Sequence, residues 1–505
     1  MTNHLFDLIR SRIGAPSKHL METDDGRHLS YADMLGETAR MANALRALGV
    51  KPGDRVAVQA DKSPEMIFLY LACLRAGAVF LPLNTGYTLA EIDYFVGDAT
   101  PALIICRPQA LEAMRALGAK HGARAVESLG ILRDGTFAAA AARALDSFAD
   151  QPAGKDDLAA ILYTSGTTGR SKGAMLSHGN LASNALTLVE TWRFTADDTL
   201  IHALPIYHTH GLFVATNVIL LAGASMIFQN KFDAGAVMKA MPRATSLMGV
   251  PTFYTRLLDH PGLTKAAAAH MRLFVSGSAP LLAETHDAWR ERTGQAILER
   301  YGMTETNMIT SNPYDGDRRA GTVGFPLDGI SVRIANAETG AAVPQGEIGV
   351  IEVKGPNVFR GYWKMPEKTK SEFRADGFFI TGDLAVIDPR GYVQIVGRAK
   401  DLIISGGFNV YPKEIESEID AIDGVVESAV IGVPHPDFGE GVAAVVVRAE
   451  GAAVDEKQML KILEGRLAKF KLPKAVFFVD DLPRNAMGKV QKNILREEHK
   501  ALFRQ

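Results

Sequence analysis

The sequence has few cysteines and no excess of charge of either sign. Only Cys73 and Cys106 occur in 505 residues, both in apolar runs and far from any group of histidines. This argues against a disulfide framework and against a zinc site. The formal net charge is −2 at pH 7, so no basic excess indicates a nucleic-acid partner or an anionic membrane surface. We expect buried thiols in a reducing compartment.

A long apolar segment is also missing. The first ten residues, MTNHLFDLIR, contain no apolar stretch or cleavage site of a signal peptide. The one uncharged span near membrane length, residues 211–230, is interrupted by polar residues and Gly223. A helix at 211–221, a turn and a strand at 225–229 explain it better than a membrane span. The sequence therefore predicts a soluble cytoplasmic protein.

The length and the order of patterns predict the fold class. A chain of 505 residues is too long for one hydrophobic core. From residue 50, strands at 54–59, 78–81 and 102–106 alternate with helices at 65–76 and 89–96. This alternation predicts an α/β fold with parallel-type sheets and flanking helices. The Ala-rich stretch 137–150 is expected to form a solvent-facing helix before a linker.

After Pro412 the pattern is that of a smaller domain. Helices are expected at 413–421 and 456–469, and strands at 428–432, 442–448 and 475–479. These elements predict a compact α+β domain of about a hundred residues, within the usual size range.

The most informative stretch is Tyr163–Gly173, YTSGTTGRSKG, which follows an apolar run. Its glycines let backbone N–H groups approach an anion, its hydroxyls add donors, and Lys172 adds a cation suited to phosphate. It is not a Walker A loop, because two residues separate Gly169 from Lys172. The residues alone leave a phosphate loop and a plain surface turn both open.

Other segments carry polar or small residues where strands and turns are expected. They are 204–211 (LPIYHTHG), 276–280 (SGSAP), 299–306 (ERYGMTET), 377–383 (GFFITGD), 396–412 (VGRAKDLIISGGFNVYP) and 483–492 (PRNAMGKVQK). His208 and His210 do not share a helix face, and no carboxylate or cysteine stands nearby, which argues against a metal there. Each segment taken alone also fits a structural turn, cap or solvated lysine.

Together, and in this order, these segments resemble the motifs of the adenylate-forming enzymes, a superfamily of acyl-CoA synthetases, peptide-synthetase adenylation domains and firefly luciferase. The resemblance extends from about residue 10 to about residue 495. It implies a large N-terminal domain at 1–397, a hinge at 398–401 and a small, mobile C-terminal domain at 402–505. It also implies two half-reactions. A carboxylate attacks ATP, with Mg²⁺ as cofactor, and the thiol of CoA, the co-substrate, then displaces AMP.

The resemblance also implies roles for single residues. The expected ATP-binding residues are Thr164, Ser165, Gly166, Thr167, Thr168, Gly169, Lys172, Ser278, Glu299, Tyr301, Gly302, Thr304, Asp383, Arg398 and Lys489. The expected catalytic residues are Lys489, Glu305, His208 and Thr304, with Glu305 as the Mg²⁺ ligand. Tyr301 would lie against adenine. Asp383, expected past a strand end, would accept hydrogen bonds from both ribose hydroxyls, and Arg398 would hold a ribose hydroxyl. Lys400 is the expected hinge residue, and CoA would meet Ser405, Gly406 and Gly407.

Two sequence strings and one cation, Arg300, suggest which acid is the substrate. The strings ERYGMTE and YHTHG look most like those of the malonyl-CoA synthetases, which implies malonate, with methylmalonate tolerated. The second carboxylate of malonate needs a cation, for which Arg300 is the first candidate and Arg256 the second. His208 and Ser278 would line the acid site, and His210 is a weaker candidate. Because adjacent strand residues face opposite sides, Arg300 reaches that site only if the strand ends or twists at Gly302.

Alternatives stay open. A short- or medium-chain fatty or aryl acyl-CoA synthetase would need an apolar acid pocket. A peptide-synthetase-like domain would need an acidic anchor near 204–211, where no Asp occurs. A nucleotide-binding scaffold without activity would not need the full set of Lys172, Glu305, Asp383, Arg398 and Lys489.

A regulatory partner is expected at one lysine. Acetylation of Lys489 would remove its charge, so a lysine acetyltransferase and deacetylase are the expected macromolecular partners.

Overall fold

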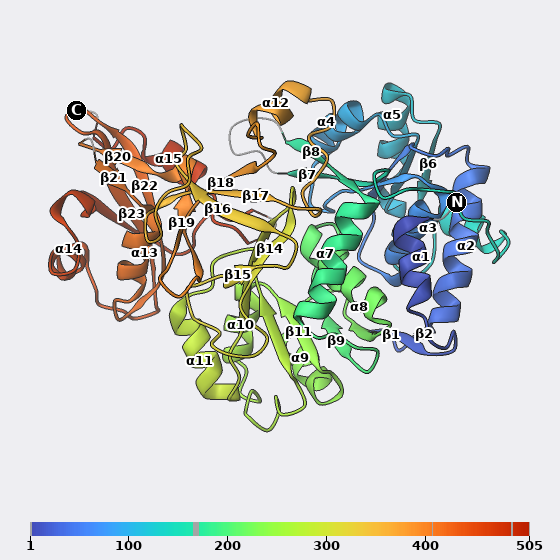
Figure 1. The fold of residues 1–505 in the computed structure, drawn as a ribbon, viewed down its shortest axis with the longest axis horizontal. Coiled ribbons are helices and arrows are strands. Elements are labelled where there is room, and N and C mark those ends of the chain that lie inside the picture. Colours follow the sequence, from blue (N-terminus) through green and yellow to red (C-terminus); the bar gives the residue numbers. More distant parts are fainter. Residues whose placement is uncertain (1–2, 165–170, 407, 486–487, 504–505) are drawn as a thin grey trace. The chain divides into compact units, whose positions relative to one another are not determined.

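The computed structural model describes residues 3–164, 171–406, 408–485 and 488–503 (Figure 1). Packing divides the chain into two compact units, one made of Met1–Ser331 and Val353–Gly377, the other of Val332–Glu352 and Phe378–Gln505. The predicted domain boundaries were drawn from sequence motifs and not from packing, so the two units do not test them and they stay predictions. Lys400, the predicted hinge residue, lies within the second unit.

A six-stranded sheet in the order β6-β5-β3-β4-β7-β8 forms one part of the first unit. Its strands are β3 (Arg55–Gln59), β4 (Val79–Pro82), β5 (Leu103–Cys106), β6 (Ala125–Ser128), β7 (Leu158–Thr164) and β8 (Lys172–Ser177). All pair in parallel except β8, which runs antiparallel to β7. The strands β4 and β5 are apolar throughout because helices cover both faces of the sheet.

A nine-stranded sheet in the order β15-β14-β13-β12-β11-β9-β10-β1-β2 forms the other part. Its strands are β1 (His19–Thr23), β2 (His28–Ser30), β9 (Thr199–His202), β10 (Ser225–Phe228), β11 (Ser246–Gly249), β12 (Leu273–Ser276), β13 (Leu298–Met303), β14 (Asn307–Ser311) and β15 (Phe325–Pro326). The six strands from β13 to β1 pair in parallel, and antiparallel strands occupy both ends.

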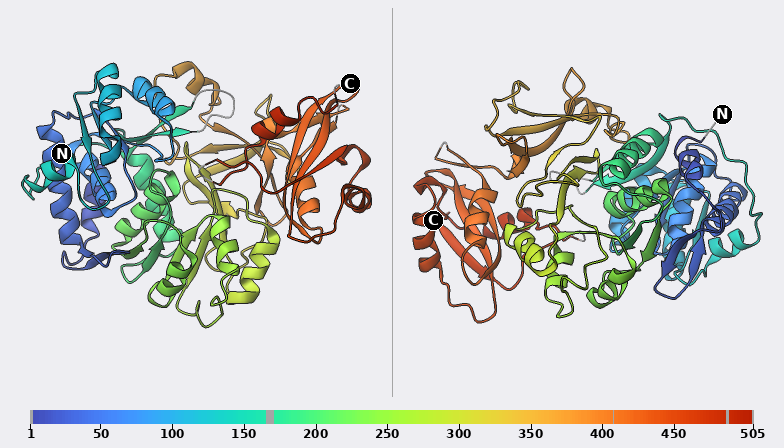
Figure 2. Two further views of the ribbon diagram at one scale, coloured as in Figure 1. Left: turned by 180° about the vertical axis from the view of Figure 1, so that it is seen from behind. Right: turned by 60° about the horizontal axis from the view of Figure 1, so that its bottom comes forward.

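A layer of helices lies between these two sheets. It contains α1 (His4–Ser11), α3 (Pro64–Ala76), α7 (His178–Thr191) and α8 (Asn217–Ala222), which contact one another and strands of both sheets. Figure 2 shows the green helices α7 and α8 beside the blue N-terminal helices. All 13 residues of α3 are buried, as expected of a helix with packed neighbours on every side.

The outer faces of the sheets are covered by other helices. Helices α4 (Leu89–Ala99) and α5 (Leu111–His121) pack on the six-stranded sheet, and α9 (Ala234–Ala240), α10 (Pro251–Leu258) and α11 (Ala283–Thr293) pack on the nine-stranded sheet. The remaining helices of this unit are α2 (Tyr31–Ala47), α6 (Thr136–Ala142), α12 (Pro366–Ser371), a π-helix at His210–Thr216 and 3₁₀ turns at Pro108–Ala110 and Met241–Arg243.

The second unit contains one smaller sheet and most of another. One has the order β16-β17-β18-β19, with β16 (Ser331–Ala335), β17 (Gly349–Lys354), β18 (Phe379–Ile387) and β19 (Val393–Arg398). The other has β20 (Ile403–Ser405), β21 (Phe408–Val410), β22 (Val425–His435), β23 (Gly439–Arg448) and β24 (Ala475–Val479). One face of this sheet packs on α13 (Pro412–Asp420) and α14 (Glu456–Glu464), the other on α15 (Lys492–His499). Turns at Ala399–Asp401 and Lys469–Lys471 are 3₁₀.

The predicted α/β class and the alternation of strands and helices are confirmed. Cys73 and Cys106 are buried free thiols, as expected. Within the described residues, no helix is long and apolar enough to cross a membrane.

The lengths predicted for two helices are wrong. The helix predicted at 137–150 ends at Ala142, since residues beyond it bind neighbouring helices: Asp146 pairs with Arg40, and Asp150 lies 2.6 Å from Nε of the buried Arg75. The helix predicted at 456–469 ends at Glu464, followed by Gly465.

Candidate active site

The glycine-rich motif connects two paired strands. Thr164, the last residue of β7, is the antiparallel partner of Lys172, the first residue of β8, and its hydroxyl lies 3.4 Å from the Lys172 carbonyl. The predicted ATP-binding residues Ser165, Gly166, Thr167, Thr168 and Gly169 lie outside the described residues.

A chain of polar contacts starts at Lys172. Its Nζ lies 4.4 Å from the centre of the Tyr362 ring and 3.8 Å from Oε1 of Glu372. The Tyr362 hydroxyl donates to Oε1 of Glu305 over 2.9 Å. Glu305 is only 5% exposed, and its burial raises the pKa of the carboxyl group above its ordinary value. The structure thus joins the two predicted polar residues Lys172 and Glu305 through Tyr362.

Glu305 is held by the turn between β13 and β14. A Cβ on Gly302 would lie 2.1 Å from the Asn307 carbonyl oxygen, so this position requires glycine. The Phe359 N–H donates to the Glu305 carbonyl over 2.7 Å and fixes the turn from outside. Tyr301 and Thr304, on either side of Gly302, are partly exposed, as residues that meet a ligand would be.

Arg300 lies on the buried side of β13. Its side chain is 3% exposed, and a Cβ on Gly277 would lie 2.5 Å from its Cζ, so the guanidinium lies directly against that glycine. Nε and Nη2 are buried and have no hydrogen-bond partner among the described residues. Burial lowers the pKa of Arg300 to about 9. An irregularity in the pairing of β13 with β14 falls between Tyr301 and Gly302. It lies next to Gly302, where the strand was expected to end or twist if Arg300 is to reach the acid site.

Polar residues of three other elements surround this guanidinium. His210 begins the π-helix, and both burial and the charge of Arg300 lower its pKa well below the ordinary value, so the ring is neutral. Its Nδ1 lies 3.2 Å from Oγ of Ser278, which has a positive φ of 74° in the turn after β12. The Tyr254 hydroxyl, on α10, donates to the Val275 carbonyl over 2.6 Å.

The other acid-site candidates lie as follows. His208 is half-buried, with its ring centre 4.5 Å from that of Tyr207. Arg256, the second candidate for the distal carboxylate, is exposed on α10, so the geometry favours Arg300. The carboxylate of Glu299 accepts the Leu281 N–H over 3.3 Å and so braces the turn that carries Ser278.

In the second unit, the two predicted ribose ligands are neighbours. Asp383 on β18 is the cross-strand partner of Arg398 on β19, with 3.1 Å between Oδ1 and Nε. The expectation that Asp383 follows a strand end is wrong, because β18 continues to Ile387. The strand bends instead at Gly382, whose φ is 75°.

The remaining predicted residues of this unit lie on a 3₁₀ turn, at the end of β20 and on loops. Lys400 is exposed in the 3₁₀ turn Ala399–Asp401, Ser405 is buried, and Gly406 has a positive φ of 58°. Gly407 lies outside the described residues. Lys489 is exposed, and its N–H donates to the Asn485 side chain over 3.0 Å.

The sequence did not indicate Tyr362 or Glu372 as site residues. Gly277 and Tyr254 lie in the segments 276–280 and 250–254, which resemble the family's strings beside the acid pocket, but no role of its own was predicted for either residue. The only signal for Tyr362 was an aromatic pair after a glycine, Gly361-Tyr362-Trp363, in a segment without periodicity.

Comparisons with known proteins identify the family to which the chain is similar. The family model described as AMP-binding enzyme matches residues 13–363, and that of the AMP-binding enzyme C-terminal domain matches residues 414–489. A solved structure of ATP-bound MatB from Rhodopseudomonas palustris is similar, with 64% identity, a TM-score of 0.98 and 100% coverage of both chains. A feruloyl-CoA synthase from Amycolatopsis is 40% identical over 475 residues, covering 93% of this chain and 94% of that protein. A malonate–CoA ligase from Arabidopsis thaliana is 34% identical over 522 residues, covering 94% and 85%.

Proposed function

The chain belongs to the family of AMP-binding enzymes, and we propose that it joins malonate, and also methylmalonate, to CoA. ATP activates the acid as an acyl-adenylate with release of pyrophosphate. The CoA thiol then attacks the acyl carbon and AMP leaves.

One observation carries the choice of acid: a buried arginine with unpartnered donors. Nε and Nη2 of Arg300 lack partners among the described residues, and burial of such a cation costs several kcal/mol unless an anion pairs with it. The guanidinium fork matches a carboxylate. Malonate supplies one carboxylate to ATP and a second to this arginine. The relative named malonate–CoA ligase supports the same substrate.

A second candidate is an aryl or short-chain fatty acyl-CoA ligase, which the relative named feruloyl-CoA synthase favours by sequence identity. An aryl or alkyl acid has no second carboxylate, so it would leave the Arg300 donors unpaired. The buried charge therefore favours the dicarboxylate.

In the first half-reaction the residues position ATP and acid. Lys172, Thr164, Thr304 and the loop between β7 and β8 bind the phosphates, and Tyr301 lies against adenine, beside Gly302 and Glu299. Asp383 and Arg398 hold the ribose. His208 and Ser278 hold the reacting carboxylate, which Lys489 also contacts.

The Glu305 carboxylate fits Mg²⁺ as a ligand. It is a hard oxygen donor, buried beside Lys172 and oriented by Tyr362. Bound there, Mg²⁺ would neutralise charge on the triphosphate.

The second half-reaction requires a change of arrangement. We expect the smaller domain to rotate about Lys400, which withdraws Lys489 and brings Ser405, Gly406 and Gly407 to CoA. Lys489 is exposed, so a lysine acetyltransferase and deacetylase could control the first step by changing its charge. Location in the cytoplasm stays a prediction, supported by two free thiols.

A panel of acids tests the proposal. Pyrophosphate release and thioester formation are measured with acetate, butyrate, benzoate, ferulate, malonate, methylmalonate and succinate, each with ATP and CoA. Malonate should have the highest kcat/KM, followed by methylmalonate. A preference for ferulate or benzoate would overturn malonate but not the ligase, whereas no acid-dependent pyrophosphate release at all would overturn both.

A further inference from the structure

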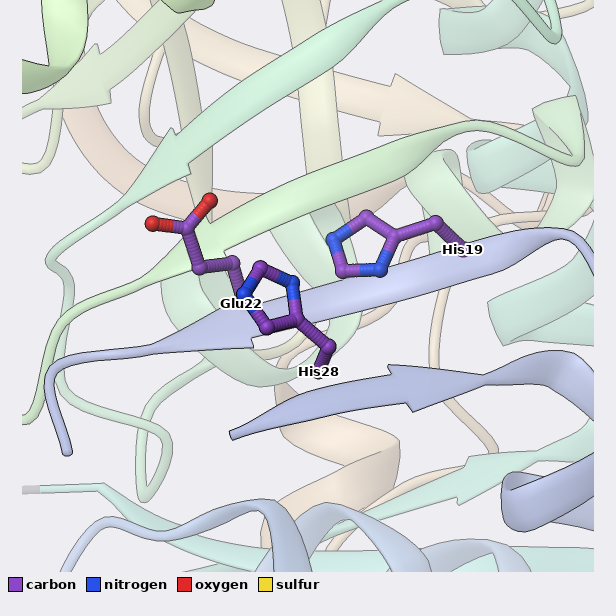
Figure 3. Close-up of side chains that lie close together, drawn as sticks. All are labelled: His19, Glu22 and His28. Atoms are coloured by element: carbon purple, nitrogen blue, oxygen red, sulfur yellow. The ribbon is translucent and has the colours of Figure 1, made fainter. Parts of the chain in front are cut away.

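Three side chains at one edge of the nine-stranded sheet form a group that the proposed reaction does not use. His19 and Glu22 lie on β1, and His28 lies on the edge strand β2 (Figure 3). Two imidazole nitrogens and one carboxylate oxygen lie within 4.8 Å of one another. We propose that these residues bind a divalent transition metal of the Zn²⁺ or Ni²⁺ class.

An irregularity in β1 brings two of the ligands to one face. In a regular strand, residues three apart face opposite sides. Here His19 pairs with Ser30 and Met21 with Leu29, so Leu20 is an extra residue between them. Leu20 and Met21 are consecutive and both buried, at 1% and 0% exposure. This β-bulge turns His19 and Glu22 to the same outer face.

The third ligand comes from the neighbouring strand. His28 is the direct cross-strand partner of Glu22, and directly opposite residues share a face. The rings of His19 and His28 have centres 5.2 Å apart and are tilted by 47°, so they do not stack. Figure 3 shows the three side chains on the same side of the hairpin, with the two rings near each other.

The donor set selects the class of metal. Two imidazoles and a carboxylate suit Zn²⁺, Ni²⁺ and Cu²⁺, whereas Mg²⁺ and Ca²⁺ prefer oxygen alone. Ligand atoms about 2.1 Å from a tetrahedral ion are about 3.4 Å apart. Since the ligand atoms lie within 4.8 Å of one another, they move together by at most about 1.4 Å on binding, a movement that side-chain torsions at a partly exposed edge allow.

Glu22 also has an orienting partner. Nη1 of Arg243 lies 2.6 Å from Oε2 of Glu22. A carboxylate has two oxygens, so Arg243 can hold one while the other binds the metal. Residues that do not bind a metal themselves commonly orient its ligands in this way. Bound there, the metal would connect β1 to the three-residue edge strand β2.

Calorimetric titration of the tag-free, metal-free protein with Zn²⁺ and with Ni²⁺ tests the proposal. Excess Mg²⁺ is present throughout, so that oxygen sites such as Glu305 are occupied by the harder ion. One ion should bind per chain, and His19→Ala and His28→Ala should each weaken binding by at least about tenfold. His270→Ala removes another exposed histidine and should leave binding unchanged.

A spectroscopic measurement covers the case in which a variant folds poorly. Co²⁺ added to the wild type should give visible absorption bands of an N/O-coordinated ion, and equimolar Zn²⁺ should remove them. Absence of a site of one-to-one stoichiometry in the wild type would overturn the proposal. So would equal affinity of the wild type and a folded His28→Ala protein, whatever the result of the acid panel.

Discussion

The charge of Arg300 is the residue-scale feature that links structure to substrate. Its Nε and Nη2 donors lack partners among the described residues, and burial lowers the pKa of Arg300 to about 9. Breaking a buried charge pair costs about 3–5 kcal/mol. Arg300→Ala should therefore lower kcat/KM for malonate by about two to four decades, while activity with acetate or propionate changes little.

Arg256→Ala is the matched control, since it removes an exposed arginine from the helix beside the site. It should retain full malonate activity. If Arg300→Ala lowers malonate and acetate activity by one common factor, Arg300 has a structural or nucleotide-side role and the malonate proposal loses its physical basis.

A substitution at Gly277 tests whether the Arg300 guanidinium must keep its position. A Cβ at this position would lie 2.5 Å from Cζ and 2.7 Å from Nη1 of Arg300, too close for the guanidinium to keep its position. Gly277→Ala should displace the fork by about 1 Å and lower kcat/KM for malonate by about a hundredfold, with a smaller effect on acetate. Gly14→Ala is the control, because nothing lies within 4 Å of a Cβ there. Unchanged malonate kinetics in Gly277→Ala would show that Arg300 does not need its present position.

Residue-scale contacts were the part of the site that the sequence could not provide. Motif residues such as Lys172, Glu305 and Arg300 were predicted because they stand within recognisable strings. Tyr362 and Gly277 act through contacts with residues far along the chain, and such contacts exist only once the sheets have formed. The side of the strand that Arg300 occupies likewise depended on pairing with β14, which periodicity does not encode.

At the scale of elements, α7 carries a buried histidine that makes stability depend on pH. His178 is the first residue of the helix, and both ring nitrogens are buried without a partner among the described residues. Burial lowers its pKa to about 4, against an ordinary value of 6.5. The unfolded chain therefore takes up a proton first, and stability present above pH 6.5 is lost as pH falls toward 4, by at most about 3 kcal/mol.

Urea unfolding of wild type and His178→Gln between pH 7 and 4.5 checks this. The variant should lose less stability than the wild type over this range, whatever its stability at pH 7. His270→Gln, at an exposed histidine, should keep the wild-type pH dependence. Parallel pH profiles for His178→Gln and wild type would contradict the assignment.

Elements were predicted well where local rules act alone. Helix α3 has Ser63 as its N-cap and Gly77 as its left-handed C-cap, both readable from sequence. Elements set by tertiary contacts were missed. The Ala-rich stretch after α6 stops being helical where its aspartates pair with arginines of other helices. The π-helix at His210–Thr216 was expected only as an ordinary helix.

At the scale of the whole molecule, the predicted site residues belong to two separately packed units. Lys172, Glu305 and Arg300 lie in the first, and Asp383 and Lys489 lie in the second. Class, order of elements and most motifs followed from the sequence. The two packing units are a different division from the predicted domains, which stay a prediction: packing groups residues 332–352 and 378–398, which hold most of one sheet, with the second unit. A reaction that needs residues from both units requires that their arrangement be controlled.

Two substitutions should separate the half-reactions. Lys489→Ala removes the cation proposed for adenylation, so malonate-dependent pyrophosphate release should fall to background, while thioester formation from preformed malonyl-adenylate and CoA is largely kept.

Lys400→Pro should keep adenylation and lose thioester formation, because proline fixes φ in the proposed hinge and restricts the residue before it. Lys400→Ala, which leaves the backbone free, is its control and should turn over normally. If Lys400→Pro forms thioester at the wild-type rate, or if Lys489→Ala loses both half-reactions equally, rotation about Lys400 does not govern this enzyme, and one arrangement of the units must serve both steps.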